Sequence, residues 1–250
     1  AKLRKEIRGM KTARTVKRAA RQRGGVPALT VVGYTNAGKS SLVNAMTGSG
    51  VLVQDALFAT LDPTTRRAKL ADGHEVVFTD TVGFVRHLPT QLVEAFRSTL
   101  EEAVDADLLI HVVDGADPFP AKQISAVRKV LGEVFEEEKV SPPPELLVIN
   151  KIDAVDSATL TALRGEYRDA AFVSARTGEG IDELFARITE FVEQGDVEAV
   201  LAVPFDRGEV IARLHQQAHV LGAEHTADGT RIRARMPAGL AGEFKDLIVD

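Results

Sequence analysis

The 250-residue chain contains no cysteine, which excludes disulfide bonds and metal sites built from thiolates. It also lacks an apolar run approaching the roughly 18 residues of a membrane-spanning helix, and its first residues lack the apolar core of a signal peptide. No internal repeat, metal-binding cluster or nucleophilic triad is apparent. We therefore expect a soluble, cytoplasmic protein that has no membrane partner.

Charge is distributed unevenly along the chain. The net charge is −5, yet residues 1–25 contain ten Lys or Arg residues and a single acid, so the remainder carries −14. Apolar residues recur at helical spacing over residues 1–22, and Gly24 to Pro27 would end this helix. Its basic face either contacts an anionic partner such as RNA or stays solvated while the apolar stripe packs on another part of the protein.

The pattern G-x-x-x-x-G-K-S at residues 33–40 follows directly on the apolar segment 28–32. A strand, a glycine-rich turn and a helix that begins at Lys39 are typical of a phosphate-binding loop, whose backbone N–H groups converge on phosphate oxygens. A bulky residue at Gly33 or Gly38 would block this approach. Lys39 would face the terminal phosphates, and the Ser40 hydroxyl is suited to binding Mg²⁺. The candidate contacts are Gly33, Tyr34, Thr35, Asn36, Ala37, Gly38, Lys39 and Ser40.

Two further segments are candidates for sensing a third phosphate. The strand 76–79 ends in D-x-x-G, where Asp80 would hold Mg²⁺ through water and the Gly83 N–H would bond the γ-phosphate. Upstream, Thr60 would complete the Mg²⁺ shell only when that phosphate is present. Thr64 and Thr65 are nearby competitors for this role, and the alternative is a threonine that merely begins a strand. The assigned contacts are Phe58, Ala59, Thr60, Leu61, Asp62, Asp80, Thr81, Val82 and Gly83, with catalytic roles for Lys39, Thr60 and Gly83 and metal ligation by Ser40 and Thr60.

The base is indicated by N-K-x-D at residues 150–153, after the apolar strand 146–149. The Asp153 carboxylate can accept both the ring N1–H and the exocyclic amine of guanine, and adenine offers no such pair of donors. The Asn150 amide suits the guanine N7/O6 edge, and the Lys151 stem can lie over the ring. The alternative is a plain helix start capped by Asp153. The candidate contacts are Asn150, Lys151, Ile152 and Asp153, together with Ser174, Ala175 and Arg176, where a backbone N–H would meet guanine O6.

The position after D-x-x-G holds Phe84, where Ras-like enzymes have a glutamine that orients the attacking water. A phenyl ring cannot do this, so hydrolysis should be slow unless another group supplies the function, or Phe84 simply packs outward. A potassium ion bound by Asn36 is one candidate, although asparagine also suits turns for backbone reasons. Arg66, Arg67 and Arg86 either act in cis or are solvated charges.

The strings G-Y-T-N-A-G-K-S, L-F-A-T-L-D-P-T, D-T-V-G-F-V-R-H-L-P and N-K-I-D resemble the HflX family of ribosome-associated GTPases. The resemblance implies a GTPase that is slow without a partner, uses Mg²⁺, binds the large ribosomal subunit and its RNA and splits stalled ribosomes into subunits. It also implies an N-terminal domain ahead of the basic helix. We expect a monomer that does not bind DNA. The alternatives are a potassium-stimulated GTPase of tRNA modification or ribosome assembly, and a non-catalytic nucleotide-state switch.

Strands alternate with helices from residue 28 to about 194, which predicts an α/β fold with a doubly wound, mostly parallel sheet. We expect a basic helical linker (1–25), a GTPase domain (26–195) and a small C-terminal α/β domain (200–250) of βαβ type, with Gly195 to Val203 as the boundary. The dipeptide Asp228-Gly229 indicates a hairpin. After it, an arginine ladder of Arg231, Arg233 and Arg235 either contacts RNA phosphates or forms a solvated strand face.

Overall fold

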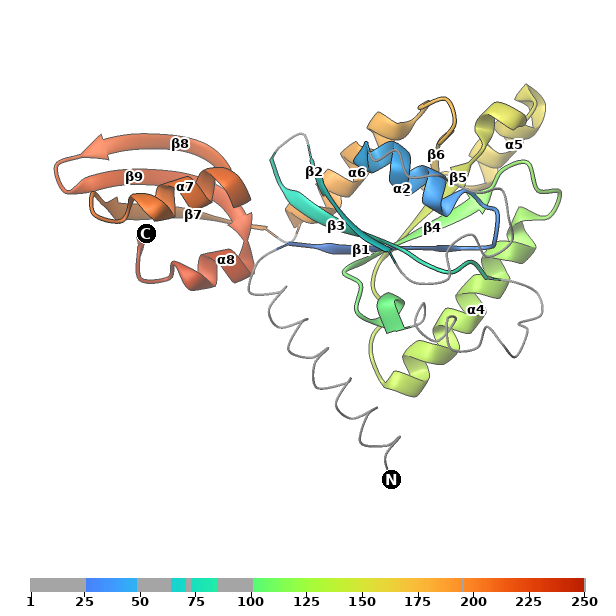
Figure 1. Cartoon of the computed structure of the whole chain (residues 1–250), viewed down its shortest axis with the longest axis horizontal. Coiled ribbons are helices and arrows are strands. Elements are labelled where there is room, and N and C mark those ends of the chain that lie inside the picture. The colour runs from blue at the N-terminus through green and yellow to red at the C-terminus, as the bar shows by residue number, and fades with distance from the viewer. Residues whose placement is uncertain (1–25, 49–63, 71–72, 85–100, 195, 250) are drawn as a thin grey trace. The chain divides into compact units, whose positions relative to one another are not determined.

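The structure, a computed structural model, describes residues 26–48, 64–70, 73–84, 101–194 and 196–249. These residues form two compact units that divide near residue 187. The first is built on a six-stranded sheet and the second on a four-stranded sheet (Figure 1). Within these ranges, no helix combines the length and apolar character that a membrane crossing requires.

The six-stranded sheet has the strand order β2-β3-β1-β4-β5-β6. The strands from β3 through β1, β4 and β5 to β6 pair in parallel. This confirms the predicted doubly wound sheet, because parallel neighbours need a crossover connection such as the helices that the sequence places between them. The strands are β1 (Ala28–Gly33), β2 (Thr64–Lys69), β3 (Glu75–Asp80), β4 (Leu108–Asp114), β5 (Glu145–Asn150) and β6 (Ala171–Phe172).

Helices cover both faces of this sheet. Every residue of β1 is buried, as are six of the seven in β4, which explains their nearly continuous apolar sequences. On one face, α4 (Pro120–Glu138) packs against β1 and β4, and α5 (Ser157–Glu166) packs beside it. On the other face lie α2 (Lys39–Thr47) and the first half of α6 (Ile181–Gln194) (Figure 1). The loops at the carboxyl ends of the strands are thus the expected place for a ligand.

The second unit is an antiparallel sheet with the order β10-β7-β9-β8. Its chain order is strand, helix, two strands, helix and strand, which is the split βαβ arrangement. Leu201, Val203, Ile232, Leu214 and Phe244 contribute to its apolar core. The elements are β7 (Asp196–Pro204), α7 (Gly208–Gln217), β8 (His219–Thr226), β9 (Gly229–Pro237), α8 (Ala238–Glu243) and β10 (Ile248–Val249).

The stretch expected to be a boundary, residues 195–203, is largely β7. Leu201 and Val203 point into the core while Ala202 between them is exposed, so the strand follows the usual alternation of a half-buried strand. The predicted hairpin at Asp228-Gly229 is present, since β8 ends at Thr226 and β9 begins at Gly229. The predicted end of the first domain at residue 195 and the predicted start of the second at residue 200 stay predictions. The first strand of the second sheet, β7, begins at Asp196, before residue 200.

Candidate nucleotide-binding site

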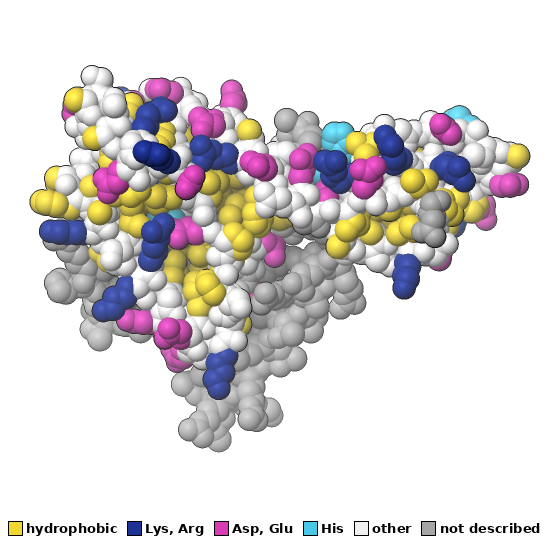
Figure 2. All heavy atoms as spheres, turned by 180° about the vertical axis from the view of Figure 1, so that it is seen from behind, with side chains coloured by type: hydrophobic (Ala, Val, Ile, Leu, Met, Phe, Trp, Pro, Cys, Tyr) yellow, Lys and Arg dark blue, Asp and Glu magenta, His cyan; other side chains and the backbone are white. Residues whose placement is uncertain are grey.

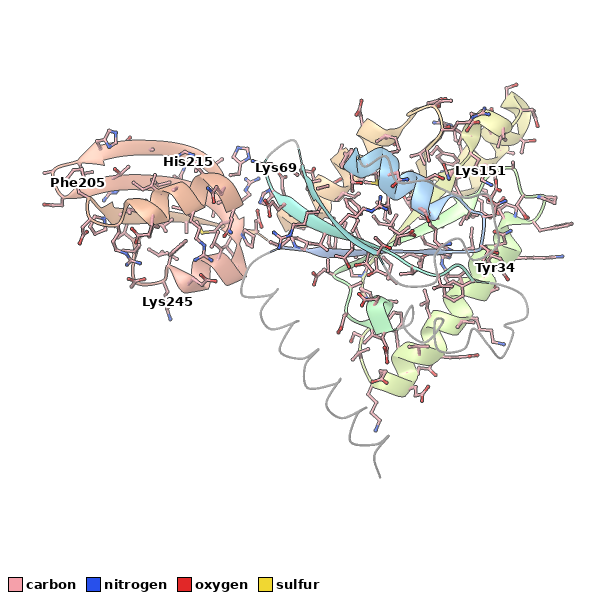
Figure 3. All side chains as sticks on the ribbon, viewed as in Figure 1. Tyr34, Lys69, Lys151, Phe205, His215 and Lys245 are labelled. Atoms are coloured by element: carbon pink, nitrogen blue, oxygen red, sulfur yellow. The ribbon has the colours of Figure 1, made fainter. Side chains whose placement is uncertain are left out.

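Four of the five predicted motifs lie at the carboxyl ends of neighbouring parallel strands. The turn 33–38 follows β1, the segment 80–84 ends β3, residues 150–153 follow β5, and residues 174–176 follow β6. Figure 3 shows the labelled side chains of Tyr34 and Lys151 on the same side of this unit. Motifs separated by more than a hundred residues therefore meet along one edge of the sheet.

Glycine is required in the turn 33–38 because protein atoms, and not only a ligand, approach its backbone. A Cβ at Gly33, which has a φ of 143°, would lie 2.1 Å from the Val112 carbonyl oxygen. A Cβ at Gly38, with a φ of 90°, would lie 2.3 Å from the Asn150 side-chain nitrogen. Asn36 also has a positive φ, 61°, so the turn itself gives a reason for asparagine there.

Lys39 and Ser40 are held by this same edge. The Lys39 side chain is 6% exposed, and its Nζ donates to the Tyr34 carbonyl oxygen at 2.9 Å. Burial lowers the pKa of the Lys39 ammonium to about 8, and the Asp80 charge only partly opposes this. The Ser40 hydroxyl donates to Asp80 Oδ2 at 2.5 Å. A cation, a hydroxyl and a carboxylate are thus gathered beside the glycine turn.

The D-x-x-G segment is hydrogen bonded to the glycine turn. The Phe84 N–H donates to the Gly33 carbonyl oxygen at 3.0 Å, and the Thr35 N–H donates to the Phe84 carbonyl oxygen at 2.8 Å. A Cβ at Gly83 would lie 2.6 Å from Thr35 Cα and 2.7 Å from Lys39 Nζ. Only glycine brings the backbone this close to the lysine ammonium.

The Phe84 side chain packs inward, so the alternative that it points outward from the switch is wrong. It is 3% exposed and belongs to an apolar cluster with Val32, Leu109 and Leu131. An apolar ring gains by leaving water, whereas a glutamine at this position would need polar partners. The residue after D-x-x-G is therefore part of the core beneath the turn.

The side chains of Thr81, Val82 and Ile152, which the sequence assigns to nucleotide contacts, are buried. Thr81 is fully buried, and its hydroxyl donates to the Val31 carbonyl oxygen at 2.6 Å. Val82 and Ile152 are 1% and 4% exposed. Their side chains support the loops, and only their backbone remains to face a ligand.

Asn150 links three motifs, and its contact with the guanine N7/O6 edge stays a prediction. Its Nδ2 donates to the Ala37 carbonyl oxygen at 2.9 Å, and its Oδ1 accepts from the Ala175 N–H at 3.0 Å. The side chain is 1% exposed. The Ala175 N–H donates to this amide, and the predicted contact of a backbone N–H of residues 174–176 with guanine O6 stays a prediction. Asn150 thus clamps the glycine turn to the segment after β6.

Lys151 is oriented by an aspartate that the sequence analysis missed. Its Nζ lies 2.7 Å from Asp114 Oδ2, and its backbone has a φ of 62°. Asp114 ends β4 and pairs with Asn150 in the parallel register, so it lies beside the N-K-x-D motif. An acid that ends an apolar strand at the same edge is the signal that could have identified it.

The Asp153 carboxylate is held on both oxygens. The Ser174 hydroxyl donates to Oδ1, and the Arg176 guanidinium pairs with Oδ2. The hydrogen bond from Ser174, with help from the Arg176 charge, lowers the pKa of the Asp153 carboxyl below its ordinary value. Asp153 is therefore an ionised acceptor at the end of β5, and it does not act as the helix cap of the alternative interpretation, because Asp156 caps α5.

Three of the predicted basic residues, Arg66, Arg233 and Arg235, contact neighbouring polar or acidic side chains. Arg66 donates to Asn44 of α2. In the second unit, Arg233 lies 3.7 Å from Glu198, and Arg235 lies 3.9 Å from Glu193. Figure 2 shows basic and acidic side chains interspersed on the visible face of this unit. Three predicted features lie outside the described residues: the basic helix 1–25, the switch segment 58–62 with Thr60, and Arg86.

Comparisons with known proteins agree with this architecture. Residues 28–151 match the protein family described as 50S ribosome-binding GTPase. A solved structure of SsGBP in complex with GDP has a TM-score of 0.50 and 30% sequence identity, and the match covers 68% of this chain and 50% of that one.

Curated relatives are similar over nearly the whole chain. GTPase HflX of Akkermansia muciniphila is 38% identical over 242 residues, which are 95% of this chain and 54% of the relative. GTPase HflX of Escherichia coli is 42% identical over 223 residues, which are 88% of this chain and 51% of the relative. The chain spans about half the length of the curated relatives it matches. It belongs to the HflX family of P-loop GTPases.

Proposed function

We propose that this chain binds a guanine nucleotide together with Mg²⁺ and hydrolyses GTP. The observation that carries the proposal is the meeting, at one edge of the sheet, of the buried Lys39, the Ser40–Asp80 pair and the ionised Asp153. The end of this edge that holds Lys39, Ser40 and Asp80 suits phosphates, and the end that holds Asp153 suits a base. A nucleotide is the ligand that presents both.

The oxygen ligands near the phosphate end fit Mg²⁺. The Ser40 hydroxyl and the Asp80 carboxylate lie side by side, and both are hard oxygen ligands. The part of the chain that the structure describes holds no group of three or more His, Cys, Asp or Glu side chains that would form an all-protein metal cage. Mg²⁺ suits such a site because it keeps water and phosphate ligands, and it would neutralise charge on the phosphate oxygens. We propose Thr60 as a further ligand.

Each residue at the phosphate end has a role that follows from its position. Lys39 places a buried cation beside the glycine turn, where an anionic phosphate would offset the cost of burying its charge. Gly83 brings its backbone close to Lys39, so its N–H is available to a γ-phosphate oxygen. Hydrolysis then depends on positioning and charge stabilisation, without a covalent intermediate.

The base-reading role of Asp153 is tested by the Asp153→Asn variant. An amide presents a donor where guanine also presents one, so affinity should shift from guanine towards xanthine nucleotides. Fluorescent GDP and XDP are titrated against the wild type, Asp153→Asn and the control Asp169→Asn, which changes an exposed aspartate elsewhere on the same unit. An unchanged preference for guanine would remove Asp153 from base recognition.

We further propose that hydrolysis is slow without a partner and that the partner is the large ribosomal subunit. Phe84 is buried and cannot orient water, so a partner or a bound cation must complete the site. The family description and the HflX relatives support the ribosome as that partner. Splitting of stalled ribosomes is part of the proposal. The proposal does not require potassium binding by Asn36, because the positive φ at this position already explains an asparagine there.

Turnover of GTP measured with and without large ribosomal subunits tests this part of the proposal. The assay is run in potassium and then in sodium, with Lys39→Ala as the inactive control. Strong stimulation by the subunits is expected, and a potassium requirement would implicate Asn36. No stimulation in either salt would remove the ribosome as activator, and would favour a nucleotide-state switch or a different RNA particle.

A further inference from the structure

Arg176 forms an ion pair with the carboxylate of Asp153, the group to which we assign base recognition. It lies in the loop after β6, and its guanidinium Nη2 pairs with Asp153 Oδ2 at the edge of the sheet. The Arg176 side chain is 76% exposed, whereas that of Asp153 is 12% exposed. An exposed cation is thus paired with a largely enclosed anion.

The two oxygens of Asp153 are not equivalent. Oδ1 accepts from the hydroxyl of Ser174, a fully buried residue that also accepts from the Thr177 N–H at 3.1 Å. This part of the structure fixes the carboxylate plane. Oδ2 pairs with the guanidinium of the exposed Arg176. The outer oxygen is therefore the one at which a partner can be exchanged.

A guanidinium and the Watson–Crick edge of guanine offer a carboxylate the same chemistry. Guanine presents N1–H and an exocyclic N–H from one planar N–C–N unit, and arginine presents two N–H groups from a planar N–C–N unit. Both therefore suit two parallel hydrogen bonds to one carboxylate. A base that uses both oxygens of Asp153 must displace Arg176 from Oδ2.

We propose that Arg176 is an intramolecular competitor of guanine for Asp153, which weakens nucleotide binding and makes it dependent on salt. The inference rests on the proposed base-reading role of Asp153. An exposed ion pair stabilises by a small amount, so Arg176 holds Asp153 for part of the time and lowers the competent fraction about two- to sixfold. Salt screens an exposed pair of charges but leaves the neutral guanine largely unaffected.

The experiment compares the wild type with Arg176→Ala, and with Arg168→Ala as a matched control that removes an exposed arginine from the same unit. Fluorescent GDP is titrated at low salt and at about 1 M salt, where screening is nearly complete. Arg176→Ala should bind GDP about two- to sixfold more tightly at low salt, and the gain should shrink towards one at high salt. Arg168→Ala should bind GDP with the same affinity as the wild type at both salt concentrations.

Any of three results would overturn the proposal. Weaker binding by Arg176→Ala would mean that the arginine helps to hold the nucleotide, for instance by lying over the base. Equal binding at low salt would mean that the ion pair does not compete. A gain that persists unchanged at high salt would also contradict an electrostatic competitor.

The Asp153→Asn background separates this inference from the function on which it rests. Asparagine carries no charge to attract Arg176. The XDP affinity of the double variant Asp153→Asn, Arg176→Ala should therefore lie within about 1.5-fold of that of Asp153→Asn alone. If Asp153→Asn keeps the preference for guanine, base recognition by Asp153 is wrong whatever Arg176 does. If the preference shifts to xanthine and Arg176→Ala has no effect in the wild-type background, only the competitor is wrong.

Discussion

Removal of the Asn150 side chain should destabilise the unit that contains the six-stranded sheet and also weaken nucleotide binding. In Asn150→Ala, the Ala37 carbonyl oxygen and the Ala175 N–H lose their partner. A buried polar group without a partner costs about 1–3 kcal/mol. Ala37 is buried and Ala175 is only partly buried, so water can rehydrate the second group in part. We therefore expect a loss of about 2–4 kcal/mol in unfolding free energy.

The loss is measured by urea denaturation of the nucleotide-free chain. Far-UV circular dichroism is the suitable probe because the sequence has no tryptophan. Asn44→Ala is the matched control, since Asn44 is only partly buried and should cost about 1 kcal/mol or less. Asn150→Asp separates the two bonds, because it keeps an acceptor for the Ala175 N–H and turns the donor towards Ala37 into a second acceptor.

The expected pattern is a comparable loss in both Asn150 variants and a small loss in Asn44→Ala. A loss below about 1 kcal/mol in Asn150→Ala, accompanied by abolished GDP binding, would refute the clamp. That result would leave Asn150 with the base-contacting role that the sequence indicates and without a role in joining the two segments.

Two further predictions concern charges at the same edge. Burial lowers the pKa of Lys39 to about 8 in the folded chain, whereas in the unfolded chain the pKa is about 10.4. Between these two pH values only the unfolded state binds the proton, so the free energy of unfolding should rise with pH. Relative to Lys39→Met, the unfolding free energy of the wild type should rise by up to about 1.4 kcal/mol per pH unit in this range. The same pH dependence in the wild type and in Lys39→Met would contradict the prediction. Asp114→Asn should weaken GDP binding about two- to fivefold while changing stability by less than about 1 kcal/mol, because it removes a partly exposed ion pair that orients Lys151. An unchanged GDP titration would show that Lys151 needs no such support.

Much of the site could be predicted because its motifs are contiguous in the sequence. The string at residues 33–40 carries its own strand, turn and helix start, and the structure has β1, the turn and α2 in those places. The apolar strands that precede Asp80 and Asn150 were also evident, since strands buried on both faces have nearly continuous apolar sequences. Local pattern therefore placed most of the site on its elements.

Contacts between motifs could not be predicted in the same way. The sequence indicated that Asn150 contacts the base, but it gave no sign that the same amide joins the glycine turn to Ala175. The sequence did not determine whether the Phe84 side chain packs inward or outward. In the structure it packs inward, against Val32 and Leu131. Such contacts depend on which strands become neighbours, and no short stretch of sequence contains that information.

The sequence by itself determined the chemistry available to this protein: a glycine turn with a lysine and a serine, an acid after β3, and an acid after β5. It did so because backbone propensity and side-chain chemistry are local properties. Only the tertiary structure decided how these groups are used. The parallel register brings Asp114 to Lys151 and Asn150 to Ala37, and the segment after β6 delivers Arg176 to Asp153. These pairings follow from the strand order of the sheet, which depends on packing over the whole unit.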